Sequence, residues 1–215
     1  MRVTTLVQPP DGFHYYPDFL SVDDERALIE HIMALEFSEV RMHGITAKRR
    51  VSHFGWIYGY ESWRLARGPQ VPDFLLPLRE RAAPLLDGEP KDLSEVLVTE
   101  YPPGAGIGWH RDAPMFGPAV IGISIASACR FRFRRDHAGQ SESRTLMLEP
   151  RSLYILRGAA RVQWQHSIPP TKALRYSITF RTVRDESRWA AAEEPAVTMT
   201  SNGGKPRLGK KEGCG

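Results

Sequence analysis

Cysteine is scarce in this chain, and the scarcity limits the kinds of protein that it can be. Two cysteines occur in 215 residues, Cys129 in an apolar stretch and Cys214 in a glycine- and lysine-rich end. Cysteines so few and so placed provide neither a disulfide framework nor the ligand set of a structural zinc site. The sequence therefore predicts a protein of a reducing compartment, and we expect it in the cytoplasm.

Long apolar runs are also missing. No stretch approaches the roughly 20 apolar residues of a membrane span, and the first 18 residues contain no apolar run of signal-peptide length. We therefore expect no membrane anchor, no leader and, without any pattern for self-association, a monomer. The 41% hydrophobic and 25% charged residues are typical of a folded soluble domain, and the net charge of +4 permits an anionic partner without requiring one.

Helical patterns come early in the chain. Ser21 is a good N-cap for a helix over residues 22–35, where acidic residues fill the first turn and apolar residues recur at helical spacing. A second helix is expected within residues 71–87, but Pro77 and Pro84 make it short or kinked. Both helices are expected to pack on a core.

From Glu95 onward the pattern changes to short β-type runs separated by turns. This density of strands after helices predicts an α+β fold with a β-sandwich or jelly-roll core and the N-terminal helices packed outside one sheet. We expect one domain over residues 1–189 and a disordered basic tail over residues 190–215. The runs are EVLVTEY, AVIGISIA, CRFRFRR, RTLMLEP, SLYILRG, VQWQHSI and ALRYSITFRTVR.

A histidine and an aspartate stand two residues apart in the segment GWHRD. On a strand, His110 and Asp112 point to the same side and can reach one small object. A further histidine, His166, lies in a later β-type run, VQWQHSI. Two histidines and one carboxylate form the facial triad that binds Fe(II), although zinc accepts similar ligands. A polar, solvated strand face is the alternative for the pair alone.

The run LRYSITFR suggests what fills the open positions of such a metal. Arg175 and Arg181 share one face of this strand with the small polar residues between them, and the apolar residues take the other face. An arginine that points into a barrel is costly unless it meets an anion, and its planar fork suits a carboxylate. A small dicarboxylate held by metal and arginine satisfies both; a solvated face is the alternative.

Together these segments resemble a known family. The residues HRD, then His166, then RYSITFR are similar to the HxD…H…RxNxTxR signature of the AlkB-like 2-oxoglutarate- and Fe(II)-dependent dioxygenases. The resemblance extends over SEVLVTEYPPGAGIGWHRD and RRVSHFGWIYGY, and covers the chain from about Gly12 to Arg184. It implies the double-stranded β-helix, or jelly-roll, as the fold of the core.

The resemblance also implies roles for single residues. His110, Asp112 and His166 would bind Fe(II), and Arg175 would pair with the distal carboxylate of 2-oxoglutarate. Arg181 would lie near the metal-bound end of the same molecule, and Tyr101 would donate a hydrogen bond to it. Two positions depart from the family pattern, because Thr99 and Ser177 replace asparagines. Contact of these two residues with the co-substrate is therefore in doubt.

The activity implied by the resemblance is oxidative demethylation of alkylated bases in DNA, with RNA as a second substrate. Fe(II), 2-oxoglutarate and O2 would be required, and formaldehyde, succinate and CO2 released. Oxidation of a protein side chain or a small molecule on the same scaffold is the alternative within this enzyme class. A nucleic-acid-binding module with a vestigial site is a third hypothesis, and the unbroken triad argues against it.

Aromatic residues near the basic segment RRVSHFGWIYGY are the candidates for contact with a base. Trp56 and Tyr58 lie beside Arg49 and Arg50, a combination that suits stacking of an extruded base and contact with phosphate. Trp109, next to the first predicted ligand, would border the same pocket. Packing of these aromatic side chains into the core is the alternative for each.

Overall fold

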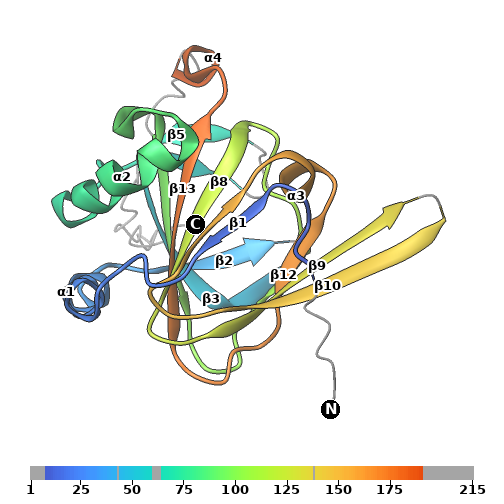
Figure 1. Ribbon diagram of the computed structural model, residues 1–215. Helices are drawn as coiled ribbons and strands as arrows, with labels where there is room; N and C mark the ends of the chain where they lie inside the picture. The colour runs from blue at the N-terminus through green and yellow to red at the C-terminus, as the bar shows by residue number, and fades with distance from the viewer. Residues whose placement is uncertain (1–7, 43, 60–63, 138, 191–215) are drawn as a thin grey trace, which may run out of the picture.

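Two antiparallel sheets form the body of the molecule (Figure 1). The computed structural model describes residues 8–42, 44–59, 64–137 and 139–190. The larger sheet has seven strands in the order β1-β11-β8-β13-β6-β3-β2, and the smaller has four in the order β10-β9-β12-β7. A short hairpin pairs β4 with β5. The jelly-roll core expected from the sequence is confirmed.

The segment EVLVTEY forms β6. This strand lies near the centre of the larger sheet, where it pairs with β13 and β3. The strands are β1 Phe13–Tyr16, β2 Ser38–Met42, β3 Ile45–Phe54, β4 Trp56–Tyr58, β5 Leu65–Arg67, β6 Glu95–Tyr101, β7 Ile107–His110, β8 Phe116–Ile125, β9 Cys129–His137, β10 Gln140–Leu148, β11 Leu153–Leu156, β12 Gln165–Ile168 and β13 Arg175–Val183.

The first helix, α1, spans Val22–Met33 and begins where the sequence predicts. The hydroxyl of Ser21 accepts a hydrogen bond from the backbone N–H of Asp24, whose carboxylate accepts one from the backbone N–H of Ser21. This capping box satisfies two backbone donors that a helix start leaves unpaired. Leu28 and Ile32 face the core from this helix.

The second helical region is short, as the two prolines predict. The helix α2 covers Leu76–Ala82, with Pro77 in its first turn, where a missing backbone N–H costs nothing. Single turns of 3-10 helix precede and follow it, the second of them beginning beside Pro84. The remaining helical segments are η1 Asp73–Leu75, η2 Ala83–Leu86, η3 Pro90–Asp92, α3 Gly158–Val162 and α4 Glu186–Ala190.

Alternation along the central strands separates a packing face from a site face. Val96 and Val98 of β6, with Ile178 and Phe180 of β13, pack in the same cluster as the buried side chains of α1 and α2. The two helices lie together on one side of the larger sheet, while the β9–β10 hairpin extends away from the other side (Figure 1). The intervening residues of β6 and β13 point into the space between the sheets.

The core between the sheets is aromatic. Phe131 and Phe133 of β9 pack edge to face with ring centroids 4.9 Å apart, and Tyr154 of β11 lies 5.0 Å from Phe131. Tyr154 lies across Gly122 of β8 so closely that a Cβ on Gly122 would collide with its ring. Glycine at this position therefore lets Tyr154 reach the space between the sheets.

No described helix combines the length and the apolar character that crossing a bilayer requires. Of the tail expected over residues 190–215, all but the first residue lies outside the described residues, so its disorder stays a prediction.

Candidate metal and co-substrate site

The three predicted metal ligands lie together on the inner side of the smaller sheet. His110 ends β7, and His166 of β12 is its direct partner across the strand pair. Their ring centroids are 4.2 Å apart. Asp112 follows two residues after His110, and its Oδ2 lies 3.7 Å from Nε2 of His166. The strand pairing thus joins residues that are more than 50 positions apart in the sequence.

The hydrogen bonds of these side chains leave donor atoms available for a cation. Nδ1 of His110 lies 2.9 Å from the carbonyl oxygen of Gly108. A carbonyl oxygen only accepts, so Nδ1 carries the proton and Nε2 keeps its lone pair. Oδ2 of Asp112 and Nδ1 of His166 are buried and have no hydrogen-bond partner among the described residues. A buried, unpaired carboxylate oxygen is costly unless a cation or donor meets it.

The protonation states suit a cation as well. Burial lowers the pKa of His166 to about 3, helped by the neighbouring His110, and burial likewise lowers the pKa of His110. For Asp112, burial alone would raise the pKa, but the guanidinium of Arg181 and the two imidazoles bring it net below its usual value. Two neutral imidazoles beside an ionised carboxylate are the state in which these groups bind metals.

Asp112 and His166 lie slightly too far apart to share an ion without adjustment. Within the described residues, no group of three or more His, Cys, Asp or Glu side chains stands in positions that could hold a metal as they are. Adjacent ligands of one ion lie about 3 Å apart when each bond is about 2.1 Å long, against 3.7 Å between Asp112 and His166. A shift of less than 1 Å in the side chains, roughly within ordinary thermal displacement, closes that gap.

Arg181 of β13 holds the aspartate in place. Its Nε donates to Oδ1 of Asp112 at 2.9 Å, and its Nη1 donates to Oε2 of Glu95 at 2.8 Å. The guanidinium therefore bridges two buried carboxylates and leaves the other oxygen of Asp112 facing His166. From the sequence, Arg181 is expected near the metal-bound end of a co-substrate. Its position beside Asp112 agrees with that expectation, which stays a prediction.

Glu95, the first residue of β6, is a component that the sequence reasoning missed. Its side chain is fully buried, and burial raises the pKa of its carboxyl group against the opposing effect of Arg181. Oε1 lies 3.9 Å from Nδ1 of His53. The sequence did contain an indication of this role. Alternation along β6 puts Glu95 on the same face as Tyr101, which the family resemblance assigns to the co-substrate.

Arg161 of α3 was also not predicted. Its side chain is buried, and its two terminal nitrogens donate to the backbone carbonyl oxygens of Asp112 and Ala113 at 3.0 and 2.9 Å. These bonds fix the chain immediately after β7. Asp112 lies beyond the end of β7. The hydrogen bonds from Arg161 therefore hold its backbone where hydrogen bonds between strands are no longer formed.

Arg175 is the strongest sign of an anion site. It is completely buried, and Nη2 donates to the hydroxyl of Ser124 at 2.9 Å, while Nε and Nη1 have no partner in the part of the chain that the structure describes. Its guanidinium carbon lies 5.1 Å from the ring centroid of Tyr101. A buried guanidinium with unsatisfied donors is unfavourable by itself, so an incoming carboxylate would remove a penalty as well as form bonds.

The residues at the two departures from the family pattern lie side by side. Ser177 of β13 and Thr99 of β6 are register partners. Both line a cavity of about 650 Å³ together with Tyr101, His110 and Arg181. Their position places short hydroxyls where the family pattern has longer amides.

Of the three aromatic residues expected at the substrate, two border this cavity. Tyr58 and Trp109 line it. The prediction for Trp56 is wrong, because its side chain is fully buried and packs with Leu65 and Phe116, under the guanidinium of Arg67 at 3.9 Å. Trp56 and Tyr58 lie two apart on β4 and both pair with β5, but only Tyr58 reaches the cavity.

The two neighbouring arginines of β3 have different surroundings. Arg49 is buried and lines the cavity. Arg50 points to the other face, where its Nε donates to Glu100 at 2.6 Å and its guanidinium lies over Phe37. Contact with an anionic substrate through this segment would therefore involve Arg49.

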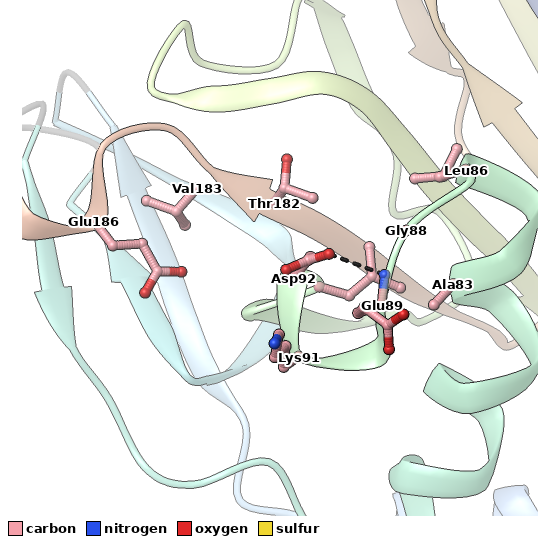
Figure 2. A pocket seen from close by; sticks show the side chains of 10 residues that line it. Ala83, Leu86, Gly88, Glu89, Lys91, Asp92, Thr182, Val183 and Glu186 are labelled. Atoms are coloured by element: carbon pink, nitrogen blue, oxygen red, sulfur yellow. Dashed lines mark hydrogen bonds between the residues drawn. The ribbon is translucent and has the colours of Figure 1, made fainter.

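Larger hollows lie elsewhere, but none of the three predicted ligands borders them. One of about 700 Å³ lies between η2, η3 and the end of β13. Figure 2 shows that its carboxylate Asp92 already accepts a hydrogen bond from the backbone N–H of Glu89, at 2.9 Å. The other, of about 760 Å³, lies beside β2 and β4.

Buried histidines make the metal-free protein sensitive to acid. Burial, with a contribution from Arg181, lowers the pKa of His53 to about 4, and His166 titrates at about 3. The folded chain therefore binds fewer protons than the unfolded chain, whose histidines titrate near 6.5. We expect the free energy of unfolding to be greatest above about pH 6.5 and to fall as the pH drops toward 4.

Denaturant titrations from pH 7.5 to 4.5 measure this dependence. His53→Gln should reduce the pH dependence of the free energy of unfolding by up to about 1.4 kcal/mol per pH unit. Identical slopes in wild type and His53→Gln would show that His53 does not take up a proton on unfolding.

Comparison with known proteins identifies the family. The model of the 2OG-Fe(II) oxygenase superfamily matches residues 12–181. An Arabidopsis thaliana protein named "Alkylated DNA repair protein ALKBH8 homolog" is 30% identical over 209 residues, covering 81% of this chain. The chain is an AlkB-like 2OG-Fe(II) oxygenase. For this AlkB-like oxygenase, the family implies Fe(II), 2-oxoglutarate and O2.

Other relatives extend the comparison. The "Probable RNA/DNA demethylase ALKBH6" of Danio rerio is 29% identical, with coverage of 75% of this chain and 70% of the relative. The AlkB-like oxygenase spans 59% of the length of the plant relative. Among solved structures, OsALKBH1 matches with a TM-score of 0.65 at 16% identity, over 80% of this chain and 96% of that one. At that identity the likeness shows the fold alone.

Proposed function

We propose that this AlkB-like oxygenase binds Fe(II) through His110, Asp112 and His166, anchors 2-oxoglutarate on Arg175, and oxidatively demethylates alkylated bases in DNA, with RNA as a second substrate. The observation that carries the proposal is the meeting of an unpaired carboxylate oxygen with two neutral imidazoles in the wall of a cavity. The buried guanidinium of Arg175, with unsatisfied donors, gives independent support for an organic acid.

Each group of the chain has a definite task in this proposal. With iron, 2-oxoglutarate and dioxygen bound, the centre oxidises a substrate C–H bond to an alcohol while the co-substrate becomes succinate and CO2. Arg181 orients Asp112, and Gly108 fixes the tautomer of His110. The apolar part of the cavity wall excludes water from the reacting groups. Hydroxylation of an N-methyl group yields a product that releases formaldehyde.

Support for a nucleic-acid substrate comes from the cavity and from the relatives. Tyr58 and Trp109 present aromatic surface at a cavity that also contains Arg49, which suits an extruded base next to its phosphate. The plant and zebrafish relatives are named for alkylated DNA repair and for RNA/DNA demethylation. A mouse relative, of which this chain spans 25%, is named as a tRNA methyltransferase.

A panel of substrates tests the proposal. Methylated DNA, methylated RNA and methylated peptides are each incubated with Fe(II), 2-oxoglutarate and the protein, and both succinate and formaldehyde are measured. We expect methylated DNA to stimulate succinate formation with matching release of formaldehyde, and unmethylated DNA of the same sequence to do neither. Stimulation by peptide or metabolite alone would overturn the nucleic-acid assignment in favour of the other oxygenase class.

A further inference from the structure

Arginines form a row on the outer face of the smaller sheet. Along β9, the side chains of Phe131 and Phe133 are buried in the core, so Arg130, Arg132 and Arg134 point outward. Arg130 and Arg134 are exposed and Arg132 is half-buried. Residues two apart on a strand are about 6.6 Å apart, a spacing comparable with that of successive phosphates along a nucleic-acid strand.

The surroundings of this row do not neutralise it. Its register neighbours on the adjacent strands are uncharged: Ser143, Thr145 and Met147 on β10, and Gln165 and Ser167 on β12. Asp136 is the next outward residue along β9, toward the tip of the hairpin, and within the described residues it forms no ion pair with Arg134. The row is therefore a concentration of positive charge between uncharged strands, with one carboxylate, Asp136, at its outer end.

The guanidinium groups are held in fixed orientations. Nε of Arg132 donates to the hydroxyl of Ser167 at 3.2 Å, and Nε of Arg134 donates to Oε1 of Gln165 at 2.8 Å. Both groups stack on Trp109, at 4.8 and 4.6 Å from a ring of its indole. Their terminal nitrogens have no acceptor among the described residues. An oriented fork with free terminal nitrogens suits an oxyanion such as phosphate.

Other arginines of the same hairpin behave differently. Arg135 and Arg144 both lie over Trp164 and both pair with Glu142, at 3.0 and 3.6 Å. The inward-facing arginines of β9 and β10 thus have an acidic partner within the protein. Within the described residues the outward row has no acidic partner, so internal ion pairs do not explain its charge.

The row is continuous with the cavity. Trp109, on which two of the arginines stack, also lines the cavity that contains His110 and Asp112. Arg111 follows, is exposed, and uses one nitrogen to donate to the carbonyl oxygen of Gln163 at 3.2 Å. A chain of positive groups therefore leads from the rim of the cavity outward along β9.

We propose that this surface, the arginine face of Trp109, Arg111, Arg130, Arg132 and Arg134, binds the phosphate backbone of the nucleic-acid strand whose target base enters the cavity. The inference rests on the proposed function and deepens it by naming the surface that holds the strand. The arginines contact phosphates and read no sequence, so they supply affinity that depends on salt. Trp109 keeps the guanidinium planes aligned beside the cavity rim.

Binding of a fluorescent single-stranded DNA 12-mer with one methylated base, followed by anisotropy from 50 to 200 mM salt, tests the arginine face. Three lost phosphate contacts should lower the magnitude of the slope of log K against log salt by roughly 2. The variant is Arg130→Ser/Arg132→Ser/Arg134→Ser. Its matched control, Arg26→Ser/Arg41→Ser/Arg188→Ser, removes the same charge from exposed arginines elsewhere and should keep the wild-type slope.

Thermal unfolding and binding of Mn(II) with 2-oxoglutarate, both expected to match wild type, verify that the triple variant is folded. Equal salt slopes in the variant and wild type would overturn the arginine face, even with active demethylation. The proposal would also be overturned if a polyglutamate peptide of equal charge displaced the labelled oligonucleotide as well as unlabelled oligonucleotide does. A lower slope in the variant, without succinate formation on any methylated nucleic acid, would instead retain the surface and refute the proposed function.

Discussion

Replacing Asp112 with asparagine is expected to lower substrate-stimulated succinate formation by roughly 100-fold or more, because even groups that only orient a metal ligand contribute 10- to 100-fold. The amide keeps the shape of the side chain and an oxygen that accepts the hydrogen bond from Arg181. It loses the negative charge that, beside the neutral imidazoles of His110 and His166, would hold the cation. Binding of Mn(II), measured by EPR, should weaken in parallel.

The exposed residue Asp136 provides the matched control. Asp136→Asn makes the same chemical change on β9, away from the three predicted ligands, and should retain wild-type turnover. Affinity for single-stranded DNA should persist in Asp112→Asn, which separates catalysis from binding. Turnover above half of the wild-type value in Asp112→Asn would show that this carboxylate is not a metal ligand.

Replacing Arg175 with methionine is expected to raise the KM for 2-oxoglutarate by roughly 10- to 100-fold, the effect of losing hydrogen bonds between charged groups. The same substitution should stabilise the protein in the absence of co-substrate. Nε and Nη1 of Arg175 are buried without partners, so an apolar side chain of similar length removes their desolvation penalty. The KM comes from initial rates of succinate formation, and the stability from thermal unfolding with and without 2-oxoglutarate.

Weaker affinity for 2-oxoglutarate together with higher stability of the free protein distinguishes an arginine that binds an anion from one that only supports the fold. Arg175→Met should unfold at a higher temperature than wild type without co-substrate and gain little from adding it. Arg175→Lys keeps the charge but not the planar fork, so its KM for 2-oxoglutarate should lie between those of wild type and Arg175→Met. A methionine variant that is less stable than wild type, with an unchanged KM, would mean that Arg175 only supports the fold.

Local patterns in the sequence were sufficient to predict much of the fold. Ser21 and the acidic first turn located α1, and the prolines limited α2, because capping and backbone restriction act within a few residues. Alternation along β13 placed Arg175 and Arg181 on the face opposite Ile178, as the structure has them. These features depend only on residues close by in the sequence, so the sequence alone is enough to predict them.

Features that depend on distant segments were predicted less well. Trp56 is buried because β5 and Phe116 cover it, and nothing within β4 indicates that cover. Arg161 acts on the backbone of Asp112, 49 residues earlier, a pairing that only the fold creates. Glu95 was within reach of alternation along β6, but a buried glutamate is uncommon enough that burial is not the first expectation.

A crystal structure of the protein with Mn(II) and 2-oxoglutarate, grown without oxygen, tests the central claim most directly. The account predicts Mn(II) bound by His110, Asp112 and His166, with the distal carboxylate of 2-oxoglutarate paired with the guanidinium of Arg175. Metal bound at other residues, or a co-substrate carboxylate that does not contact Arg175, would contradict it.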